Sequence, residues 1–422
     1  MSEIDIKNIV LDLGKRAKKA SKELALAKSE VKNAVLREAS KNLIERADFI
    51  LQENAKDIVN AEKKQLSSSM KDRLLLTKER IKSMADGLLI VADLEDPVGK
   101  VLLSLDRPSG INITKVSVPL GVIGIIYESR PNVTADAAAL CLKSGNACIL
   151  RGGSESFFSS NAIMESIKDA LEKAGLTTDC ALMLPITDRE AVGEMLKLDK
   201  YIDVIIPRGG KSLIERITKE SKIPLFKHLE GICHTYINSK ADLEMAKKVI
   251  VNAKMRRTGI CNATETMLID KSILNSHLIP ILDVLIDAGC VIKGDKHITS
   301  LDKRAVPAVD EDWDTEYLDA IISVKAVENV EEAIAHIANH SSGHTESIIT
   351  DDIKIAEKFL NEVDSAVVMH NASTQFSDGG EFGMGAEIGI STGKLHARGP
   401  VGVEQLTSFK YLVKGQGAIR KG

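Results

Sequence analysis

Apolar residues recur three and four positions apart from residue 6 to about residue 91, in a segment rich in alanine, leucine, lysine and glutamate. This spacing places apolar side chains on one face of successive α-helices. In the stretch 31–50, for example, one face carries Ala34, Val35, Ala39, Leu43 and Ala47. We expect these helices to pack on a domain that follows in the chain, and a bundle that binds a partner protein is the alternative.

A turn at residues 106–110, with the sequence DRPSG, separates two β-prone runs. Residues 111–118 alternate between apolar and polar, which predicts a strand of an exposed hairpin. Such a hairpin either mediates oligomerisation or is a plain surface feature.

From residue 120 the pattern changes to short buried strands that alternate with helices. The expected strands are 121–127, 147–150, 181–184 and 203–206, and the expected helices are 133–143, 159–173, 189–197 and 212–220. This alternation is typical of an α/β fold with a doubly wound parallel sheet, which binds ligands at the carboxyl ends of its strands.

A second α/β series follows, so the sequence predicts a second α/β domain. Its expected strands are 265–269, a short strand near 291, 320–324, 346–350 and 366–369, and its expected helices are 241–254, 273–288, 330–338 and 353–363. The segment 371–402 is instead rich in glycine and polar residues. Loops of this length in compact enzymes are usually functional or disordered, and the charged residues of this one favour function.

Composition narrows the class of protein. The 422 residues carry a net charge of -4 and only 3% are aromatic, so we expect no nucleic acid and no anionic membrane as partner. The sequence contains no run of about 18 apolar residues, so we expect no segment that spans a membrane. The six cysteines form no C-x-x-C pair, which indicates free thiols in a reducing compartment, by default the cytoplasm. The histidine spacing indicates no metal site, and we expect His336 and His340 to be solvent-exposed.

Cys261 is the best candidate for a catalytic nucleophile. It ends the sequence RRTGIC, between an expected helix and an expected strand. Arg256 and Arg257 would stabilise the thiolate, which is the reactive form of the side chain. Gly259 would let a ligand approach the backbone closely. The alternative is a buried structural cysteine.

The other cysteines are weaker candidates. Cys233 is the main rival, because an imidazole next to a thiol can activate it, and His234 follows directly. Neighbouring residues of a strand point to opposite faces, however, which weakens this interpretation. Three further cysteines lie in apolar segments typical of core: Cys141, Cys148 and Cys290.

Two glycine-rich loops, each between a strand and a helix, are typical of dinucleotide binding. The candidate cofactor-binding residues are Arg151, Gly152 and Gly153 in the first loop and Arg208, Gly209 and Gly210 in the second. Glycines expose backbone N–H groups at a helix N-terminus, which attracts phosphate. Arg151 would bind a ribose 2′-phosphate through its guanidinium, although Glu155 would repel it. Neither loop matches G-x-G-x-x-G, and each alone is also consistent with a plain turn.

Arg130 and Asn132 follow the first core strand, where a ligand is expected. Asn132 is a candidate donor to an oxyanion. It is equally a candidate to cap the helix that is expected to begin at Val133.

Several segments resemble the aldehyde dehydrogenase superfamily. They are SVPLGVIG at 117–124, YESRPN at 127–132, GNACILRGG at 145–153 and RRTGIC at 256–261. More narrowly, NASTQFSDGGEFG at 371–383 and KLHARGP at 394–400 resemble the gamma-glutamyl phosphate reductase family. The resemblance extends from about residue 119 to residue 407.

The resemblance implies a reductase of proline biosynthesis that converts gamma-glutamyl phosphate to glutamate 5-semialdehyde and phosphate, with NADP(H) as cofactor. It implies that Cys261 is the nucleophile and carries the acyl group as a thioester. Arg151 stands where the superfamily commonly has a cofactor-binding lysine, and Glu316 where a glutamate holds the nicotinamide ribose. Cys261 is then expected to ionise in a cleft shared with the nicotinamide.

The resemblance also implies an aldehyde dehydrogenase-like fold of three parts. Residues 1–104 and 119–232 would form the NADP-binding domain, and residues 233–400 the catalytic domain. Residues 105–118 and 401–422 would form an oligomerisation hairpin and tail, which implies a homo-oligomer. The family's substrate makes glutamate 5-kinase a candidate for functional contact.

The implied substrate carries an acyl phosphate, an α-carboxylate and an ammonium group. Planar guanidinium groups suit both anions, and the candidates are Arg130, Arg256, Arg257 and Arg398. The candidates for the ammonium group are Ser377, Asp378 and Glu381.

Two other readings remain. A hydrolytic aldehyde dehydrogenase would carry a glutamate that activates water, but in the matching segment 228–234 Glu230 is only roughly in register. A non-catalytic protein that keeps the fold is the second, and the intact segment around Cys261 argues against it.

Overall fold

The computed structural model describes residues 3–227 and 229–420. The chain divides into two compact units: unit 1 comprises Met1–Lys227, Gly383–Gly389 and Val401–Gly422, and unit 2 comprises His228–Phe382 and Ile390–Pro400. Three positions used in the sequence analysis lie outside the described residues. They are the first and last domain limits, residues 1 and 422, and His228, the first residue of the segment 228–234. The functional roles assigned to the domains stay predictions.

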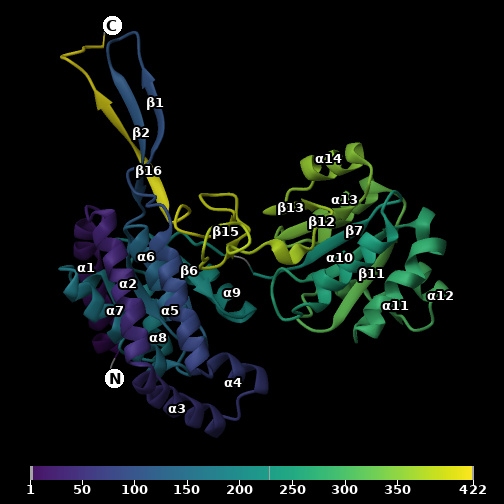
Figure 1. The fold of residues 1–422 in the computed structure, drawn as a ribbon, viewed down its shortest axis with the longest axis horizontal. Helices are drawn as coiled ribbons and strands as arrows, with labels where there is room; N and C mark the ends of the chain where they lie inside the picture. Colours follow the sequence, from purple (N-terminus) through teal and green to yellow (C-terminus); the bar gives the residue numbers. More distant parts are fainter. Residues whose placement is uncertain (1–2, 228, 421–422) are drawn as a thin grey trace. The chain divides into compact units, whose positions relative to one another are not determined.

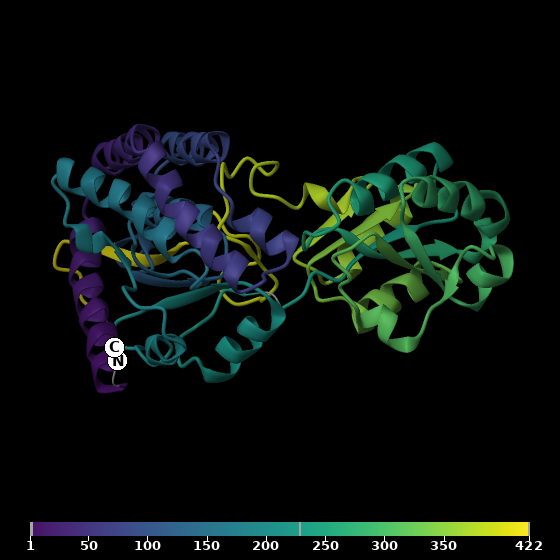
Figure 2. The same ribbon diagram turned by 90° about the horizontal axis from the view of Figure 1, so that it is seen from below.

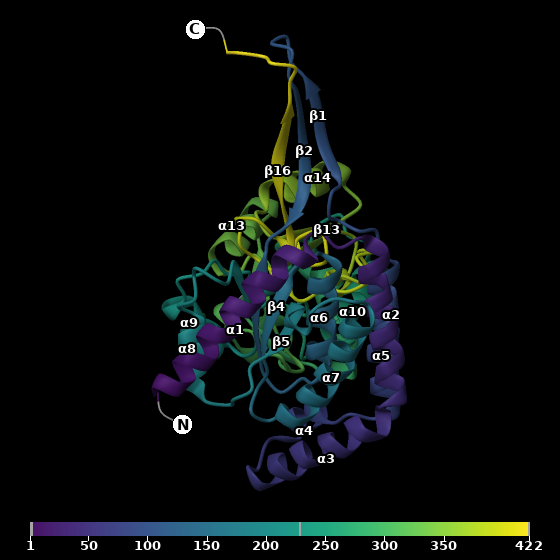
Figure 3. The same cartoon turned by 90° about the vertical axis from the view of Figure 1, so that its left-hand side faces the viewer.

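Unit 1 begins with the five helices that the periodicity indicates. They are α1 (Glu3–Leu24), α2 (Ser29–Glu45), α3 (Ala47–Lys63), α4 (Ser68–Leu74) and α5 (Lys78–Asp93). Helices α2 and α5 lie side by side (Figure 3) and pack on later helices of the same unit, while α1 packs on the central sheet. The expectation that this segment covers a following domain is therefore confirmed.

The stretch 31–50 does not form one helix. α2 ends at Glu45, α3 begins at Ala47, and Ala34 is exposed. The reason is tertiary, because α3 must turn to bring Asp57 to the start of a later helix, where its carboxylate binds backbone N–H groups.

The central sheet of unit 1 is parallel, with the strand order β5-β4-β3-β6. Its strands are β3 (Val122–Tyr127), β4 (Ala147–Arg151), β5 (Ala181–Met183) and β6 (Val204–Arg208). The connecting helices are α6 (Asn132–Lys143), α7 (Phe157–Lys173), α8 (Arg189–Met195) and α9 (Lys211–Glu220), with the 3-10 turn η1 (Thr178–Cys180). The order reverses direction between β3 and β6, which is the switch point of a doubly wound sheet. The predicted cofactor loops follow β4 and β6, and 128–132 follows β3, so all three leave carboxyl ends.

A separate antiparallel sheet projects from the rest of unit 1 (Figure 1). Its strands are β1 (Val101–Asp106), β2 (Asn112–Pro119) and β16 (Thr407–Lys414), with β2 in the middle. The predicted turn at 106–110 joins β1 to β2, and Gly110 adopts φ +82°, which favours glycine. The sequence pattern did not predict the third strand.

Unit 2 contains a seven-stranded parallel sheet with the order β10-β9-β11-β8-β7-β12-β13. The strands are β7 (Cys233–Ile237), β8 (Thr264–Asp270), β9 (Val291–Gly294), β10 (Val306–Pro307), β11 (Ile321–Val327), β12 (Thr345–Ile349) and β13 (Val367–His370). The helices are α10 (Leu243–Met255), α11 (Ile279–Asp287), α12 (Lys296–Leu301), α13 (Val330–His340) and α14 (Ile353–Glu362). One apolar core lies between the sheet and α10 to α12, and another between the sheet and α13 with α14, so helices cover both faces (Figure 2).

Two segments, the second of which is shared between unit 2 and unit 1, differ from the expected pattern. The helix expected over 273–288 begins as a 3-10 turn, η2 (Lys271–Ile273), and a π turn, η3 (Leu274–Leu278), before α11. Pro280 explains this start, because it has no N–H to continue the α-helical ladder. The long segment 371–402 is ordered by η5 (Thr374–Phe376) and by β14 (Ile390–Ser391) paired with β15 (Gly399–Pro400). A further 3-10 turn is η4 (Asp310–Asp314).

Candidate active site

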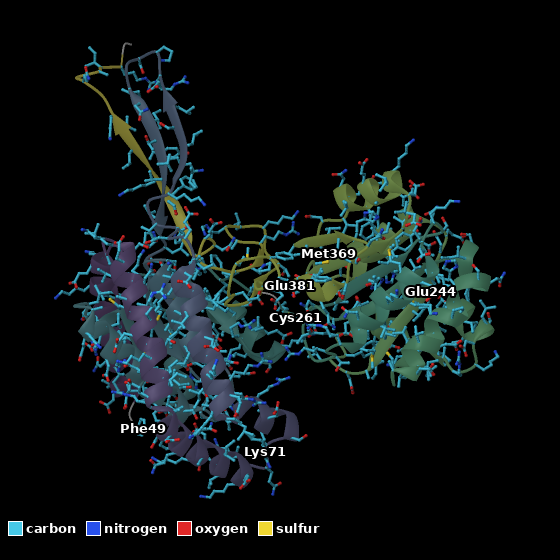
Figure 4. The ribbon with its side chains drawn as sticks, viewed as in Figure 1. Phe49, Lys71, Glu244, Cys261, Met369 and Glu381 are labelled. Atoms are coloured by element: carbon cyan, nitrogen blue, oxygen red, sulfur yellow. The ribbon has the colours of Figure 1, made fainter. Side chains whose placement is uncertain are left out.

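The candidate nucleophile lies at the amino-terminal edge of the sheet of unit 2. Cys261 precedes β8, Gly231 precedes β7, Glu316 precedes β11 and Ser342 precedes β12, and these four strands are neighbours. The amino ends of parallel strands share one edge, so these loops meet. Figure 4 shows Cys261 far from Glu244, which lies in the first turn of α10. The expectation of a ligand at carboxyl ends concerns the sheet of unit 1, and the position of Cys261 does not test it.

The backbone of Cys261 is tightly enclosed. A Cβ atom added to Gly231 would lie 1.8 Å from the Cys261 carbonyl oxygen, so only glycine fits there. The Cys233 thiol donates to that same carbonyl oxygen at 3.2 Å. The N–H of Gly231 donates to Glu316 Oε1 at 2.9 Å. These contacts fix the turn that carries the sulfur.

The six cysteines differ in exposure. All are free thiols, as expected, and five are buried whereas Cys261 is half-buried. Burial raises the pKa of Cys180 and of Cys290 to about 12. It also raises the pKa of Cys141 and Cys233 well above the ordinary value. Of the six, Cys261 is thus the one accessible thiol, and its role as nucleophile stays a prediction.

Cys233 does not use the imidazole next to it in sequence. The Nδ1 atom of His234 lies 3.0 Å from Glu346 Oε2. The imidazole near the Cys233 sulfur is that of His344, whose Nδ1 lies 3.6 Å away. The opposite-face argument from the strand period is confirmed.

Residues 256–262 form the turn that carries Cys261, here called the nucleophile turn. The long loop after β13 contacts one side of it. Arg256 Nε donates to Gln375 Oε1 at 2.8 Å. The Gln375 amide donates in turn to the carbonyls of Ala253, at 2.9 Å, and Arg257, at 3.2 Å. Sequence reasoning missed Gln375, because a single amide in a polar loop gives no local signal. Arg256 and Arg257 are both exposed, which suits contact with a substrate.

The same loop holds the other side of the turn. Asn262 Nδ2 donates to the Ser377 carbonyl at 2.9 Å. Asn262 Oδ1 and Ser377 Oγ are buried and have no hydrogen-bond partner among the described residues, so both can accept from a ligand. Asp378 is exposed, and its Oδ1 accepts the N–H groups of Gly380 at 2.8 Å and Glu381 at 3.3 Å. Asp378 therefore closes its own turn, and Glu381 is exposed in the same loop (Figure 4).

Arg398 already has a partner within unit 2. Its Nη1 donates to Asp364 Oδ1 at 2.8 Å and its Nη2 to the Asp364 carbonyl at 2.8 Å. Lys394 pairs with the same carboxylate, and the two cations hold the pKa of Asp364 below its usual range. A substrate anion at Arg398 would compete with Asp364.

In unit 1, the Arg151 side chain has an unsatisfied donor. Its Nη2 donates to the Thr187 carbonyl at 3.1 Å, while the buried Nε–H has no hydrogen-bond partner among the described residues. Burial lowers the pKa of Arg151. Glu155 Oε1 accepts from the Ser154 hydroxyl at 3.0 Å. A phosphate oxygen is the kind of acceptor that would complete this guanidinium.

The helix N-termini after the two glycine-rich loops carry carboxylates of the chain itself. At α7, buried Asp57 accepts the N–H groups of Phe158 at 3.2 Å and Ser159 at 2.8 Å. At α9, exposed Glu128 accepts the N–H of Gly210 at 2.9 Å. Among the glycine N–H groups expected to attract phosphate, that of Gly210 is thus occupied, and the exposed Glu128 that binds it can readily give way. A Cβ atom added at position 209 would lie 2.7 Å from the Glu128 side chain, so a larger residue there would displace that side chain.

The comparisons with known proteins agree over the whole chain. Residues 9–284 and 304–411 match the aldehyde dehydrogenase family. The gamma-glutamyl phosphate reductase of Paramagnetospirillum magneticum is 59% identical over 422 residues, which is 100% of both chains. That of Rhodospirillum rubrum is 59% identical over 416 residues, 99% of this chain and 97% of the relative.

The chain belongs to the gamma-glutamyl phosphate reductase family of aldehyde dehydrogenases. The crystal structure of the gamma-glutamyl phosphate reductase from Thermotoga maritima superimposes with a TM-score of 0.96 at 42% identity, covering 98% of this chain and 100% of that one. The α/β fold class and the family resemblance are confirmed. Membership implies an oxidoreductase with a nicotinamide cofactor.

Against this family background, Asn132 is not a helix cap. Helix α6 begins at Asn132 itself, and its N-cap residue is Pro131, which makes no side-chain capping bond. The capping interpretation is therefore wrong, because the amide donates to Asp136 Oδ2 at 3.0 Å, one turn further along. Burial raises the pKa of Asp136 to about 6. Asn132 and Arg130 are exposed, and their roles with substrate stay predictions.

His336 differs from its expected exposure. It is buried beside His234 and Trp313, and burial lowers its pKa to about 2. Within residues 3–227 and 229–420, no group of three or more His, Cys, Asp or Glu side chains is arranged to hold a metal ion. No helix in these same ranges is both long and apolar enough to cross a membrane.

Proposed function

We propose that this protein reduces gamma-glutamyl phosphate to glutamate 5-semialdehyde and phosphate with NADPH, as a step of proline biosynthesis. The observation that carries the proposal is the state of Cys261: a half-buried thiol in a turn fixed by Gly231 and Cys233, while the other five thiols are buried. The relatives named above support the same substrate across the full chain.

The first step is acylation of Cys261. Its thiolate attacks the acyl carbon, a C–S bond forms, and the C–O bond to phosphate breaks as phosphate leaves with the electron pair. Phosphate is a good leaving group, so the step needs little general-acid help. Backbone N–H groups of the nucleophile turn, with Asn132 as the side-chain donor, are assigned to the oxyanion. The thioester splits one difficult reaction into two easier ones.

The second step reduces the thioester. NADPH, when bound, supplies the hydride. The hemithioacetal on Cys261 then collapses, the C–S bond breaks, and aldehyde and thiolate are released. The unsatisfied Nε–H of Arg151 and the Gly210 N–H, which is held by the exposed Glu128, suit a phosphorylated dinucleotide. The residues assigned to the cofactor are Arg151, Gly152, Gly153, Arg208, Gly209 and Gly210, with Glu316 on the nicotinamide ribose.

Substrate binding is assigned to residues of both units. The orphaned acceptors Asn262 Oδ1 and Ser377 Oγ favour the ammonium end of the substrate near Ser377. The residues assigned to its anionic groups are Arg130, Arg256, Arg257 and Arg398, and those assigned to its ammonium group are Ser377, Asp378 and Glu381. Cytoplasmic location and a functional contact with glutamate 5-kinase belong to the same proposal.

The proposal also includes a homo-oligomer. The sheet of β1, β2 and β16 exposes a row of large apolar side chains, which are Val101, Leu102, Leu103, Leu105, Phe409, Tyr411, Leu412 and Val413. Exposed apolar patches of this kind mark protein contacts.

The deciding experiment replaces the sulfur. Cys261→Ala is expected to abolish phosphate-dependent reduction of NADP by glutamate 5-semialdehyde, while NADP binding by calorimetry and the melting curve stay close to wild type. Cys290→Ala, which removes a buried thiol after α11, serves as the matched control and should keep turnover. Undiminished turnover in Cys261→Ala would disprove covalent catalysis through this residue.

Two further assays separate the alternatives. A hydrolytic aldehyde dehydrogenase oxidises aldehyde without inorganic phosphate, whereas the proposed enzyme requires it. In a protein without catalysis Cys261 should react no faster than free cysteine, whereas here iodoacetamide should label it much faster than free cysteine at the same pH.

A further inference from the structure

A fully buried ion pair lies behind the nucleophile turn. Lys254 Nζ, on α10, is 2.5 Å from Glu265 Oε2, on β8, and both side chains are 0% exposed. The segment between these two residues carries Cys261. Buried ion pairs add little net stability, because desolvation offsets their attraction. This pair therefore calls for another role.

The second oxygen of Glu265 holds a strained residue. Glu265 Oε1 accepts the N–H of Leu318 at 3.3 Å. Leu318 adopts φ +52°, a left-handed conformation that is unfavourable for a residue with a Cβ atom. Its carbonyl oxygen also lies beside Gly259, 3.8 Å from a Cβ placed there. The carboxylate thus stabilises an unfavourable backbone conformation next to the nucleophile turn.

Residues 315–319, here called the Glu316 loop, are held at three successive positions. Glu316 accepts the N–H of Gly231, whose backbone lies against the Cys261 carbonyl. The Tyr317 hydroxyl lies 2.9 Å from Asp312 Oδ1 and 2.7 Å from Ser323 Oγ. The third position is the Leu318 N–H on Glu265. A loop fixed in this way presents the Glu316 carboxylate in one place.

We propose that Lys254 and Glu265 are positioning residues that hold the Glu316 loop, so that the Glu316 carboxylate stays on Gly231 beside Cys261. Lys254 holds the Glu265 carboxylate through the ion pair, and Glu265 keeps Leu318 in its left-handed conformation. Neither side chain touches substrate. The inference rests on the proposed function for the part that Glu316 plays in turnover.

The first test is a set of combined variants. Lys254→Met with Glu265→Gln removes both charges and keeps the side-chain volumes, so no unpaired charge is buried. We expect kcat/KM for NADP to fall about tenfold, as in Glu316→Gln alone. In the variant with all three substitutions, kcat/KM for NADP should be no lower than in Glu316→Gln alone, because the effects of residues that act through one group are not additive. Two results would overturn the proposal. One is a loss of kcat/KM in the triple variant equal to the product of the separate losses. The other is an unchanged kcat/KM in Lys254→Met with Glu265→Gln, here called the charge-free pair.

A second test leaves the core intact. Leu318 is 42% exposed, so substitution there does not disturb packing. Leu318→Val should lower kcat/KM about tenfold, because a β-branched residue resists the left-handed conformation. The matched control Leu318→Gly should stay near wild type and should restore activity to the charge-free pair. Equal effects of valine and glycine would refute the positioning role.

Alkylation separates this inference from the proposed function. The rate at which iodoacetamide labels Cys261 needs neither substrate nor cofactor. It should change severalfold in Leu318→Val and stay constant in Leu318→Gly, and equal rates would again refute the positioning role. Full turnover of Cys261→Ala, by contrast, would refute the proposed reaction while this labelling difference still stood.

Discussion

At the scale of single residues, the surroundings of one carbonyl group decide where the candidate nucleophile lies. The Cys261 carbonyl faces Gly231 and receives the Cys233 thiol, so the turn has little freedom. Cys233, the rival nucleophile, instead supports Cys261 through its own burial and its hydrogen bond. Catalytic groups benefit from such fixed backbones, because misplacement by about 1 Å can cost about a hundredfold in rate.

Arg151 provides a test of cofactor choice at this scale. Its buried Nε–H has no partner among the described residues, and a 2′-phosphate would supply one. We expect Arg151→Gln to raise KM for NADP at least about tenfold, since a charge-assisted bond is lost. KM for NAD, which lacks this phosphate, should change little and is the internal control. Steady-state kinetics with both cofactors measure this, and equal changes would remove Arg151 from the phosphate site.

Glu265 gives the stability of the protein a pH dependence. Burial raises its pKa from 4.5 to about 7, so the folded state binds the proton more tightly than the unfolded state. Its contribution to the free energy of unfolding is therefore full below the unfolded value and declines as the pH rises through about 7. Between about pH 5 and about pH 8, wild type should lose about 3 kcal/mol relative to Lys254→Met with Glu265→Gln. Urea unfolding across this range measures the difference, and parallel pH profiles would contradict the raised pKa.

The site residues that could be predicted from the sequence are those whose neighbours in the chain indicate their chemistry. Cys261 stands in a charged, glycine-containing turn, and Arg151 ends a strand before a glycine pair. Lys254, Glu265 and Gln375 gave no such signal. They act through contacts that the folded chain makes, such as the bond between Arg256 and Gln375 over 119 positions.

At the scale of elements, periodicity located the four strands of the unit 1 sheet and five of the seven in unit 2, because their burial is a local pattern, but it missed β7 and β10. The strand expected at 181–184, for example, is β5 (Ala181–Met183). Strand β16 was not predicted, because it is stabilised by pairing with β2, which is far away in the chain. The break between α2 and α3 at Arg46 has no glycine or proline to announce it, and follows from contacts of α3 with α7.

The start of α7 depends on a cap from another helix. Ser156, its N-cap residue, makes no side-chain capping bond, and Asp57 of α3 supplies the acceptor instead. We expect Asp57→Ala to lower the free energy of unfolding by about 2 kcal/mol, because two backbone N–H groups lose their partner. Kinetic constants should stay near wild type. The control is Asp48→Ala on the exposed face of α3, and equal urea midpoints for both variants would argue against the cap.

At the scale of the whole molecule, unit 1 carries a separate three-stranded sheet that exposes apolar side chains. β1 and β16 are its edge strands (Figure 1). Both carry exposed apolar side chains. Exposed apolar edges invite pairing with another chain.

Oligomerisation through this sheet can be measured directly. We expect Leu103→Glu with Leu105→Glu to shift the protein to smaller species in sedimentation velocity, because charges would replace the apolar contact. Leu26→Glu, at a residue 86% exposed after α1, should leave the sedimentation coefficient unchanged. A monomeric wild type, or no shift in the strand variant, would count against this surface as the interface.

The central claim is that Cys261 carries the acyl group, and a single-turnover experiment tests it most directly. Enzyme is mixed with glutamate 5-semialdehyde and NADP without phosphate, quenched, digested and mapped by mass spectrometry. The account predicts a burst of about one NADPH per chain and an acyl adduct on the peptide that contains Cys261. A full burst with that peptide unmodified, or with the adduct on another residue, would contradict it.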